Sequence, residues 1–127
     1  MTSVITICDT CKRDDWAERA ANDGVELTDG EALATLVEAA AEGVAGVETR
    51  RHSCLMGCNH GCNVSLQAAG KLTYTLGKFE TTAEAAEGIV AYAALHAESK
   101  SGQVPFKQWP QAIKGHFITR IPPLPDA

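Results

Sequence analysis

The chain has 127 residues, a length that fits one domain and leaves little room for a second core. Hydrophobic residues make up 45% and charged residues 21% of the sequence, which excludes a disordered or fibrous protein. The formal net charge of −5 argues against nucleic acid as a partner, because nucleic-acid binders are basic. We see neither a membrane span nor a secretory signal, so the expected compartment is the cytoplasm.

The first half of the chain predicts two strands separated by helical segments. Residues 3–7 are β-branched and are typical of a short buried strand. Residues 14–22 carry a weaker helical pattern. Thr28 and Glu31 have the spacing of a capping box, which predicts a helix over residues 31–42. The alternation over residues 47–51 indicates a second strand.

The second half predicts a hairpin followed by a helix. Two alternating segments, residues 64–68 and 72–76, flank the turn Ala69-Gly70-Lys71. Thr81 and Glu84 repeat the capping-box spacing and begin a helix that continues to Ala97. The order β-α-β-β-β-α predicts an α/β (α+β) fold, a small mixed sheet flanked by helices.

The last quarter of the chain has a different character. Phe106 and Trp109 are apolar anchors, and the run Ile121-Pro-Pro-Leu-Pro125 cannot lie inside a sheet because proline donates no backbone hydrogen bond. We therefore expect one domain over residues 1–97 and, over residues 98–127, an extended proline-rich extension packed on that domain.

Two groups of cysteines carry the chemistry of this sequence. The first is Cys8-x-x-Cys11, and the second contains Cys54, Cys58 and Cys62 at four-residue intervals. Five cysteines in a reducing compartment do not form a closed disulfide framework. Thiolates are soft ligands that select zinc, copper(I) or iron–sulfur clusters, so the two groups together predict a metal site.

The residues that separate the three cysteines of the second group predict a wrapped loop rather than a helix. Gly57 and Gly61 let backbone N–H groups turn toward sulfur without a Cβ in the way. His52 and His60 flank the group, and imidazole can replace thiolate at an iron–sulfur centre, although a solvent-facing role beside the site is the better interpretation. For His96 and His116 we expect plain surface positions.

The segment from Cys54 to Tyr74 resembles the second half of thioredoxin-like [2Fe–2S] ferredoxins, in which a C-L-x-x-C loop leads into a strand, a glycine turn and a strand bearing tyrosine. The resemblance covers residues 3–97. It implies a [2Fe–2S] cluster held by two ligands from each cysteine group, for which we favour Cys8, Cys11, Cys54 and Cys58. Cys62 stands where those ferredoxins usually have a proline, so it is an alternative fourth ligand, a spare ligand or a buried thiol.

The whole chain also resembles a family of uncharacterised bacterial proteins described as predicted metal-binding proteins. Members of that family are encoded near cobalamin and cobalt-handling genes, which implies a link to cobalamin or cobalt metabolism.

Three functions compete at this point. The leading one is a single-electron carrier that passes electrons to a redox partner protein and is not an enzyme by itself. The second is a zinc- or cobalt-binding protein that delivers its metal through the same thiolates. The third is a thiol oxidoreductase that uses Cys8 and Cys11 alone, which leaves the second group of cysteines unexplained. A homodimer stays open, and neither nucleic acid nor membrane is expected as a partner.

Overall fold

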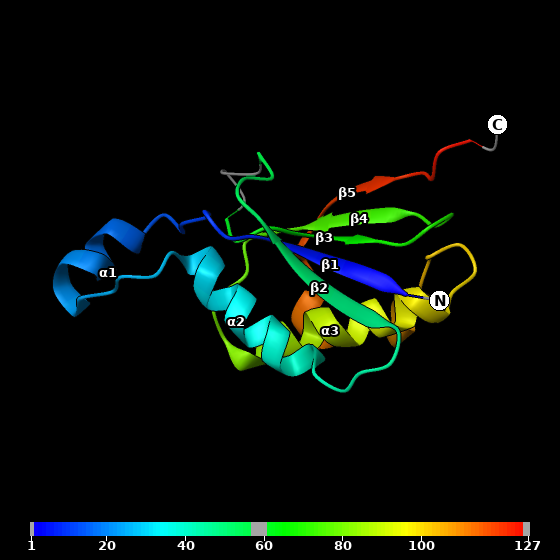
Figure 1. Ribbon diagram of the computed structural model, residues 1–127, viewed down its shortest axis with the longest axis horizontal. Helices are drawn as coiled ribbons and strands as arrows, with labels where there is room; N and C mark the ends of the chain where they lie inside the picture. Colours follow the sequence, from blue (N-terminus) through cyan, green and yellow to red (C-terminus); the bar gives the residue numbers. More distant parts are fainter. Residues whose placement is uncertain (1, 57–60, 126–127) are drawn as a thin grey trace.

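The computed structural model describes residues 2–56 and 61–125, which form a mixed sheet with helices packed on it (Figure 1). The α-helices in this part of the chain are α1 (Trp16–Asp23), α2 (Asp29–Ala41) and α3 (Ala83–Glu98), and the 3-10 turns are η2 (Phe106–Gln108) and η3 (Gln111–Ile113). The strands are β1 (Ser3–Cys8), β2 (Val47–His52), β3 (Val64–Gln67), β4 (Thr73–Leu76) and β5 (Phe117–Ile121).

The strand order within the sheet is β2-β1-β3-β4-β5. Strands β1 and β2 are parallel, which requires the crossover that α2 supplies, whereas β3, β4 and β5 each run antiparallel to the neighbour before them. The predicted α/β class is therefore confirmed, and this arrangement is consistent with a thioredoxin-like fold.

Helices α2 and α3 pack against each other and against β1 and β2, on one face of the sheet (Figure 1). Alternate residues of a strand point to opposite faces, so Ile5, Ile7 and Leu66 enter the core beneath these helices. The opposite face carries polar side chains. There the Arg50 guanidinium donates to the Thr6 hydroxyl at 2.7 Å and to the Gln67 side-chain oxygen at 3.0 Å.

The helix caps explain why two of the helices begin where they do. The Thr28 hydroxyl accepts from the Glu31 N–H at 3.0 Å, and the Glu31 carboxylate accepts from the Thr28 N–H at 3.1 Å, so the predicted capping box is confirmed. The cap predicted at Thr81 is wrong by one residue. Thr82 caps α3, because its hydroxyl lies 3.1 Å from the N–H of Ala85, three residues further on.

The C-terminal extension contains a strand that the sequence analysis missed. Strand β5 pairs with β4 and forms an edge of the sheet, and η3 packs against α3. The prolines were correctly excluded from the sheet, but the paired residues Phe117–Ile121 end immediately before Pro122. The segment is thus a strand followed by an extended tail, rather than a tail throughout.

At the N-terminal end of β1 lies a buried polar cluster formed by Ser3, Lys71 and His96. The Ser3 hydroxyl lies 2.6 Å from His96 Nδ1, and His96 Nε2 lies 2.7 Å from the carbonyl oxygen of Leu72. The Lys71 ammonium donates to the carbonyls of His96, at 3.0 Å, and Ala97, at the end of α3. The predicted surface position of His96 is wrong, because its polar atoms find all of these partners inside the fold.

None of the helices in the described residues has the length and apolar character needed to span a membrane.

Candidate functional site

The first cysteine group lies at the end of β1 opposite to the buried polar cluster. Cys8 is the last residue of β1, and Cys62 lies two residues before the first residue of β3. These two strands are antiparallel neighbours, so the end of one meets the beginning of the other. The Cys8 N–H donates to the carbonyl of Asn63 at 3.1 Å, which joins the two loops directly.

Cys8, Cys11 and Cys62 are all buried at this junction. The side-chain amide of Asn63 donates to Cys11 Sγ at 3.1 Å, and the Thr10 hydroxyl lies 3.6 Å from Cys8 Sγ. Cys8 and Cys11 share a side-chain hydrogen bond, and Cys62 interacts electrostatically with both of them. The fold therefore brings cysteines from both sequence groups to one place.

The pKa values of the three thiols at the junction are shifted in different directions. Burial raises the pKa of Cys11 to about 12, with a further contribution from the neighbouring Cys8. Burial also raises the pKa of Cys62 to about 12, assisted by the negative charge of Asp29. Burial acts on Cys8 in the same direction, but hydrogen bonds from Cys11, Thr10 and the backbone N–H of Leu55 outweigh it, and the pKa of Cys8 is lowered. Cys8 is thus the thiol best prepared to become a thiolate.

Cys54 is exposed, unlike the three thiols at the junction. Its Sγ lies 3.7 Å from the sulfur of Met56, and the next residue, Leu55, places its backbone N–H on Cys8. Cys54 and Met56 have φ values of 127° and 61°, a conformation that costs energy for residues other than glycine. The loop is therefore held in a strained form, next to Cys8, with its first sulfur facing solvent.

The remaining candidates fall into two classes. Cys58, Gly57 and His60 lie outside the described residues, so their predicted roles stay predictions. His52 is exposed at the end of β2, and its carbonyl accepts from the Asp9 N–H at 3.1 Å. A Cβ on Gly61 would lie 2.9 Å from the carbonyl oxygen of Lys12, so this glycine permits the close approach of the two loops.

Residues at the start of α2 hold the first cysteine loop in place, a contact that was not predicted from the sequence. The Thr28 hydroxyl donates to the Asp9 carbonyl at 2.5 Å, and the Gly30 N–H donates to the Cys11 carbonyl at 2.9 Å. A Cβ on Gly30 would lie only 2.0 Å from the Cys8 carbonyl oxygen. The sequence carries one signal of this contact, a glycine in the first turn of a helix, where glycine is a poor helix former.

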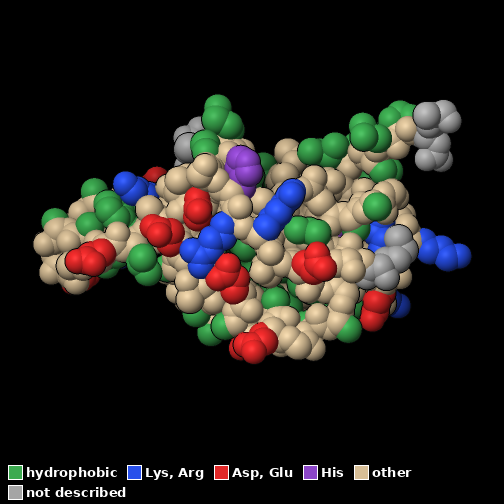
Figure 2. All heavy atoms as spheres, viewed as in Figure 1, with side chains coloured by type: hydrophobic (Ala, Val, Ile, Leu, Met, Phe, Trp, Pro, Cys, Tyr) green, Lys and Arg blue, Asp and Glu red, His purple; other side chains and the backbone are tan. Residues whose placement is uncertain are grey.

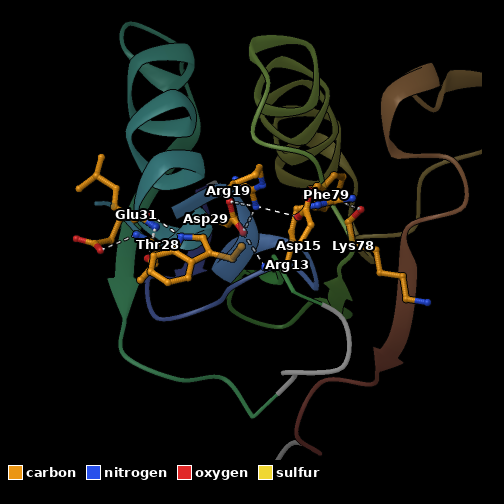
Figure 3. A network of polar contacts seen from close by, with 10 residues as sticks. Arg13, Asp15, Arg19, Thr28, Asp29, Glu31, Lys78 and Phe79 are labelled. Carbon is orange, nitrogen blue, oxygen red and sulfur yellow. Dashed lines mark hydrogen bonds and ion pairs between the residues drawn. The ribbon is translucent and has the colours of Figure 1, made fainter. Parts of the chain in front are cut away.

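A charged network fixes the segment that follows Cys11 (Figure 3). The carboxylate of Asp29, which is buried, accepts from the Arg13 N–H at 2.6 Å and from one Arg19 guanidinium nitrogen at 2.8 and 2.9 Å. Arg19 also pairs with the exposed Asp15 at 3.0 Å, and the Arg13 guanidinium donates to the carbonyl of Phe79 at 2.6 Å. Since α1 has no buried residue, these polar contacts tie it to the start of α2, together with the Trp16 indole N–H, which donates to the Leu27 carbonyl at 2.9 Å.

The donor set at this end of the sheet fits a soft metal or an iron–sulfur cluster, because it consists of thiols from two loops. Within residues 2–56 and 61–125, however, no three His, Cys, Asp or Glu side chains are already gathered closely enough to hold a metal ion. Cys58, one of the four favoured ligands, is not among these residues. If the four favoured cysteines held a metal or cluster, the thiol of Cys54, which is exposed here, would have to turn inward.

Comparisons with known proteins give a family and no closer relative. No curated protein and no solved structure matches the chain. A family model described as "Protein of unknown function (DUF1636)" matches residues 5–123, which include all five cysteines, strands β2 to β5 and all of β1 except its first two residues. The chain therefore belongs to the DUF1636 family.

Proposed function

We propose that this protein is a [2Fe–2S] ferredoxin-like electron carrier. The observation that carries the proposal is the meeting of the two cysteine groups: Cys8 and Cys11 lie buried beside Cys62, and the loop that follows Cys54 donates a backbone N–H to Cys8. Four thiolates are what a cluster of this type needs, and the chain has five cysteines, of which the structure describes Cys8, Cys11, Cys54 and Cys62.

Cys8, Cys11, Cys54 and Cys58 would hold the cluster, with Cys62 as the alternative to Cys11. When bound, the cluster supplies one-electron chemistry and needs no substrate pocket. The protein's own contribution is to hold the thiolates and to set their electrostatic surroundings. The Asn63 amide on Cys11 and the Leu55 N–H on Cys8 both donate to sulfur, which stabilises negative charge there.

The exposed position of Cys54 suits both electron exchange and metal exchange. An electron carrier needs its centre near the surface, where a partner protein can approach it. A zinc- or cobalt-delivery protein needs a ligand that an incoming acceptor can displace, and the exposed Cys54 thiol would serve equally well. Metal delivery, in cobalamin or cobalt metabolism or elsewhere, is therefore the second candidate function.

Thiol–disulfide exchange at Cys8 and Cys11 is the weaker alternative. The residues are only 2% and 4% exposed, whereas an exchanging thiol must be reached by its partner disulfide. Exchange also leaves Cys54 and Cys62 without a role.

Anaerobic reconstitution of single cysteine-to-serine variants tests the proposal. We expect Cys8→Ser and Cys54→Ser to lose the visible absorption of the cluster and its iron. Ser53→Ala is the matched control, because it changes a neighbouring hydroxyl and no thiol, and it should keep both. Full iron content and an unchanged spectrum in Cys8→Ser and Cys54→Ser would contradict the proposed ligand set.

Comparison of Cys11→Ser with Cys62→Ser decides the fourth ligand. We expect Cys11→Ser to lose iron and Cys62→Ser to keep a cluster with a shifted midpoint potential. The reverse pattern would assign the position to Cys62, which lies at the same junction.

A further inference from the structure

An apolar groove of about 420 Å³ lies beside the edge strand β5, away from the cysteine junction. It runs between β5 and the segment that contains η2, and its lining is largely aromatic. The groove therefore offers ring faces to a ligand, next to a strand edge that pairs with no other described strand. Its main lining residues are Tyr74, Val104, Phe106, Trp109, Phe117 and Arg120.

The aromatic walls of this groove are held in place by the fold. The Trp109 indole N–H donates to the Val104 carbonyl at 2.8 Å, and its ring centre lies 4.6 Å from that of Phe117 and 4.9 Å from that of Phe106. Tyr74 contacts Phe117 edge to face at 5.6 Å. A ligand would thus meet a preformed surface, which lowers the entropic cost of binding.

The described part of the C-terminal tail, residues 122–125, is apolar and exposed. Ile121 is 50% exposed and Leu124 is 92% exposed, and the tail projects from the end of β5 (Figure 1) as a strip of hydrophobic side chains (Figure 2). Its sequence, Pro122-Pro-Leu-Pro125, has the P-x-x-P pattern of segments that bind aromatic grooves as a polyproline II helix.

The tail cannot reach the groove of its own chain. The groove flanks β5, the strand from which the tail departs, so residues 122–125 would have to reverse direction immediately after Ile121. Pro122 and Pro123 have φ fixed near −65° and hold the residue before each of them extended. The chain therefore continues away from the groove, by about 3 Å per residue.

We propose that the groove binds the tail of a second copy of this chain, and that the two copies exchange tails about a two-fold axis. Such an exchange is self-complementary, because each copy supplies one tail and one groove. It covers Leu124 and the aromatic walls in a single step, and it leaves the cysteine junction free. The inference does not depend on which metal or cluster the cysteines hold.

Sedimentation equilibrium over a range of protein concentrations tests the exchange. We expect the wild-type mass to rise toward twice that of one chain, and Leu124→Ala to weaken dimerisation about a hundredfold, because burial of two leucines, one from each tail, is lost. This variant changes an exposed side chain and should fold normally. Leu27→Ala is the matched control. Leu27 is 52% exposed and lies in the connection between α1 and α2, far from the tail. Its substitution should leave the dimer unchanged.

A synthetic peptide of residues 120–125 provides a direct measurement of the groove. In a Trp16→Phe background Trp109 is the only tryptophan, so its fluorescence reports on the groove. We expect the peptide to change the emission of the Leu124→Ala protein in a saturable way, and a peptide with alanine in place of leucine to bind about tenfold more weakly.

Three results would overturn the proposal. The first is a wild-type protein that stays monomeric at all concentrations, with no response of Trp109 to the peptide. The second is a dimer that Leu124→Ala leaves intact, which would place the interface elsewhere. The third is a monomer in which Leu124→Ala alters Trp109 emission equally at every concentration, which would show that the tail contacts its own chain.

Discussion

The two ends of β1 bury polar groups in opposite ways. At the N-terminal end, His96 and Lys71 are fully enclosed, and their ring nitrogens and ammonium bind Ser3, Leu72 and the carbonyls that end α3. At the C-terminal end, burial holds the pKa of Cys11 far above its usual range, and the backbone at Cys54 is strained. The buried polar groups at the first end have hydrogen-bond partners, whereas burial at the second end opposes ionisation of Cys11.

The difference between the two ends separates a stabilising role from the chemical role proposed above. Buried polar groups that find all their partners inside a protein contribute to stability and to a unique structure. At the cysteine end, burial raises the pKa of Cys11 and Cys62, while the Asn63 amide and the Leu55 N–H donate to sulfur. Such donors would stabilise the negative charge of thiolates in the proposed metal or cluster site. The following substitutions test this contrast with the stabilising cluster around His96.

The largest effect is expected from Gly30→Ala. The new methyl group would meet the Cys8 carbonyl oxygen at 2.0 Å, and backbone cannot move aside as a side chain can. We expect a loss of about 3 kcal/mol in the free energy of unfolding, measured with urea, although alanine is the better helix former by about 1 kcal/mol.

Gly88→Ala is the matched control for Gly30→Ala. Its new methyl group would lie 2.7 Å from the Cβ of Ala112, on the short turn η3, which can shift. We expect a smaller loss, of about 1 kcal/mol. If Gly30→Ala were as stable as the wild type, the close packing of α2 on the cysteine loop would be refuted.

Asp29→Ala should destabilise the protein by about 2 kcal/mol, because it leaves the Arg13 N–H and the Arg19 guanidinium without their buried acceptor. Amide hydrogen exchange should show the loss concentrated in α1, which has no buried residue of its own. Asp15→Ala removes the exposed partner of the same arginine and should cost no more than about 0.5 kcal/mol. Equal effects of the two variants would contradict the account.

Lys71→Met should cost about 2 kcal/mol, because two buried carbonyls at the end of α3 lose their donor. Thermal unfolding of the variant measures this loss. Lys100→Met, a change of an exposed lysine just after the end of α3, should stay within about 0.5 kcal/mol of the wild type. A stabilised Lys71→Met would mean that burying the ammonium costs more than its hydrogen bonds return.

The smallest effect concerns pH. Burial lowers the pKa of His96, with a further contribution from the charge of Lys71, so the unfolded chain binds a proton more readily than the folded one. This contribution to stability is complete above the unfolded pKa of about 6.5 and is lost as pH falls toward the folded pKa. In that interval the slope approaches about 1.4 kcal/mol per pH unit.

His96→Asn should remove this part of the pH dependence, as measured by urea unfolding between pH 7 and the onset of carboxylate titration. His116→Asn serves as the control, because that ring is only partly buried, although it stacks on the buried Phe79 and its Nδ1 lies 2.8 Å from the Gly77 carbonyl oxygen. An unchanged slope in His96→Asn would show that another group titrates there.

The sequence predicted most of the fold because its signals were local. Strand β1 is a β-branched run, and the Thr28 capping box acts within four residues. Strand β5 was missed because its identity comes from pairing with β4, which lies about forty residues earlier and cannot be inferred from the five residues themselves. The burial of His96 was missed for the same reason, since its partners Ser3 and Leu72 are distant in the chain.

At the candidate site, too, local patterns were predicted from the sequence, whereas contacts between distant residues were not. Residue type and spacing predict that the five cysteines form a metal site, and this stays a prediction. They did not show that Cys62 is buried beside Cys8 and Cys11 while Cys54 faces solvent, because that arrangement depends on how β1 and β3 meet. Nor did they reveal Gly30 or Asn63, whose roles are to support the loop and to donate to a sulfur.

The visible spectrum of the protein purified without oxygen, with iron and sulfide analysis, tests the central claim most directly. We expect a red-brown protein with broad visible absorption and about two iron and two sulfide per chain, all lost in Cys8→Ser. A colourless protein that contains zinc, or a blue-green one that contains cobalt, would contradict the electron-carrier account and favour metal delivery. A metal-free wild-type protein that exchanges disulfides through Cys8 would contradict both.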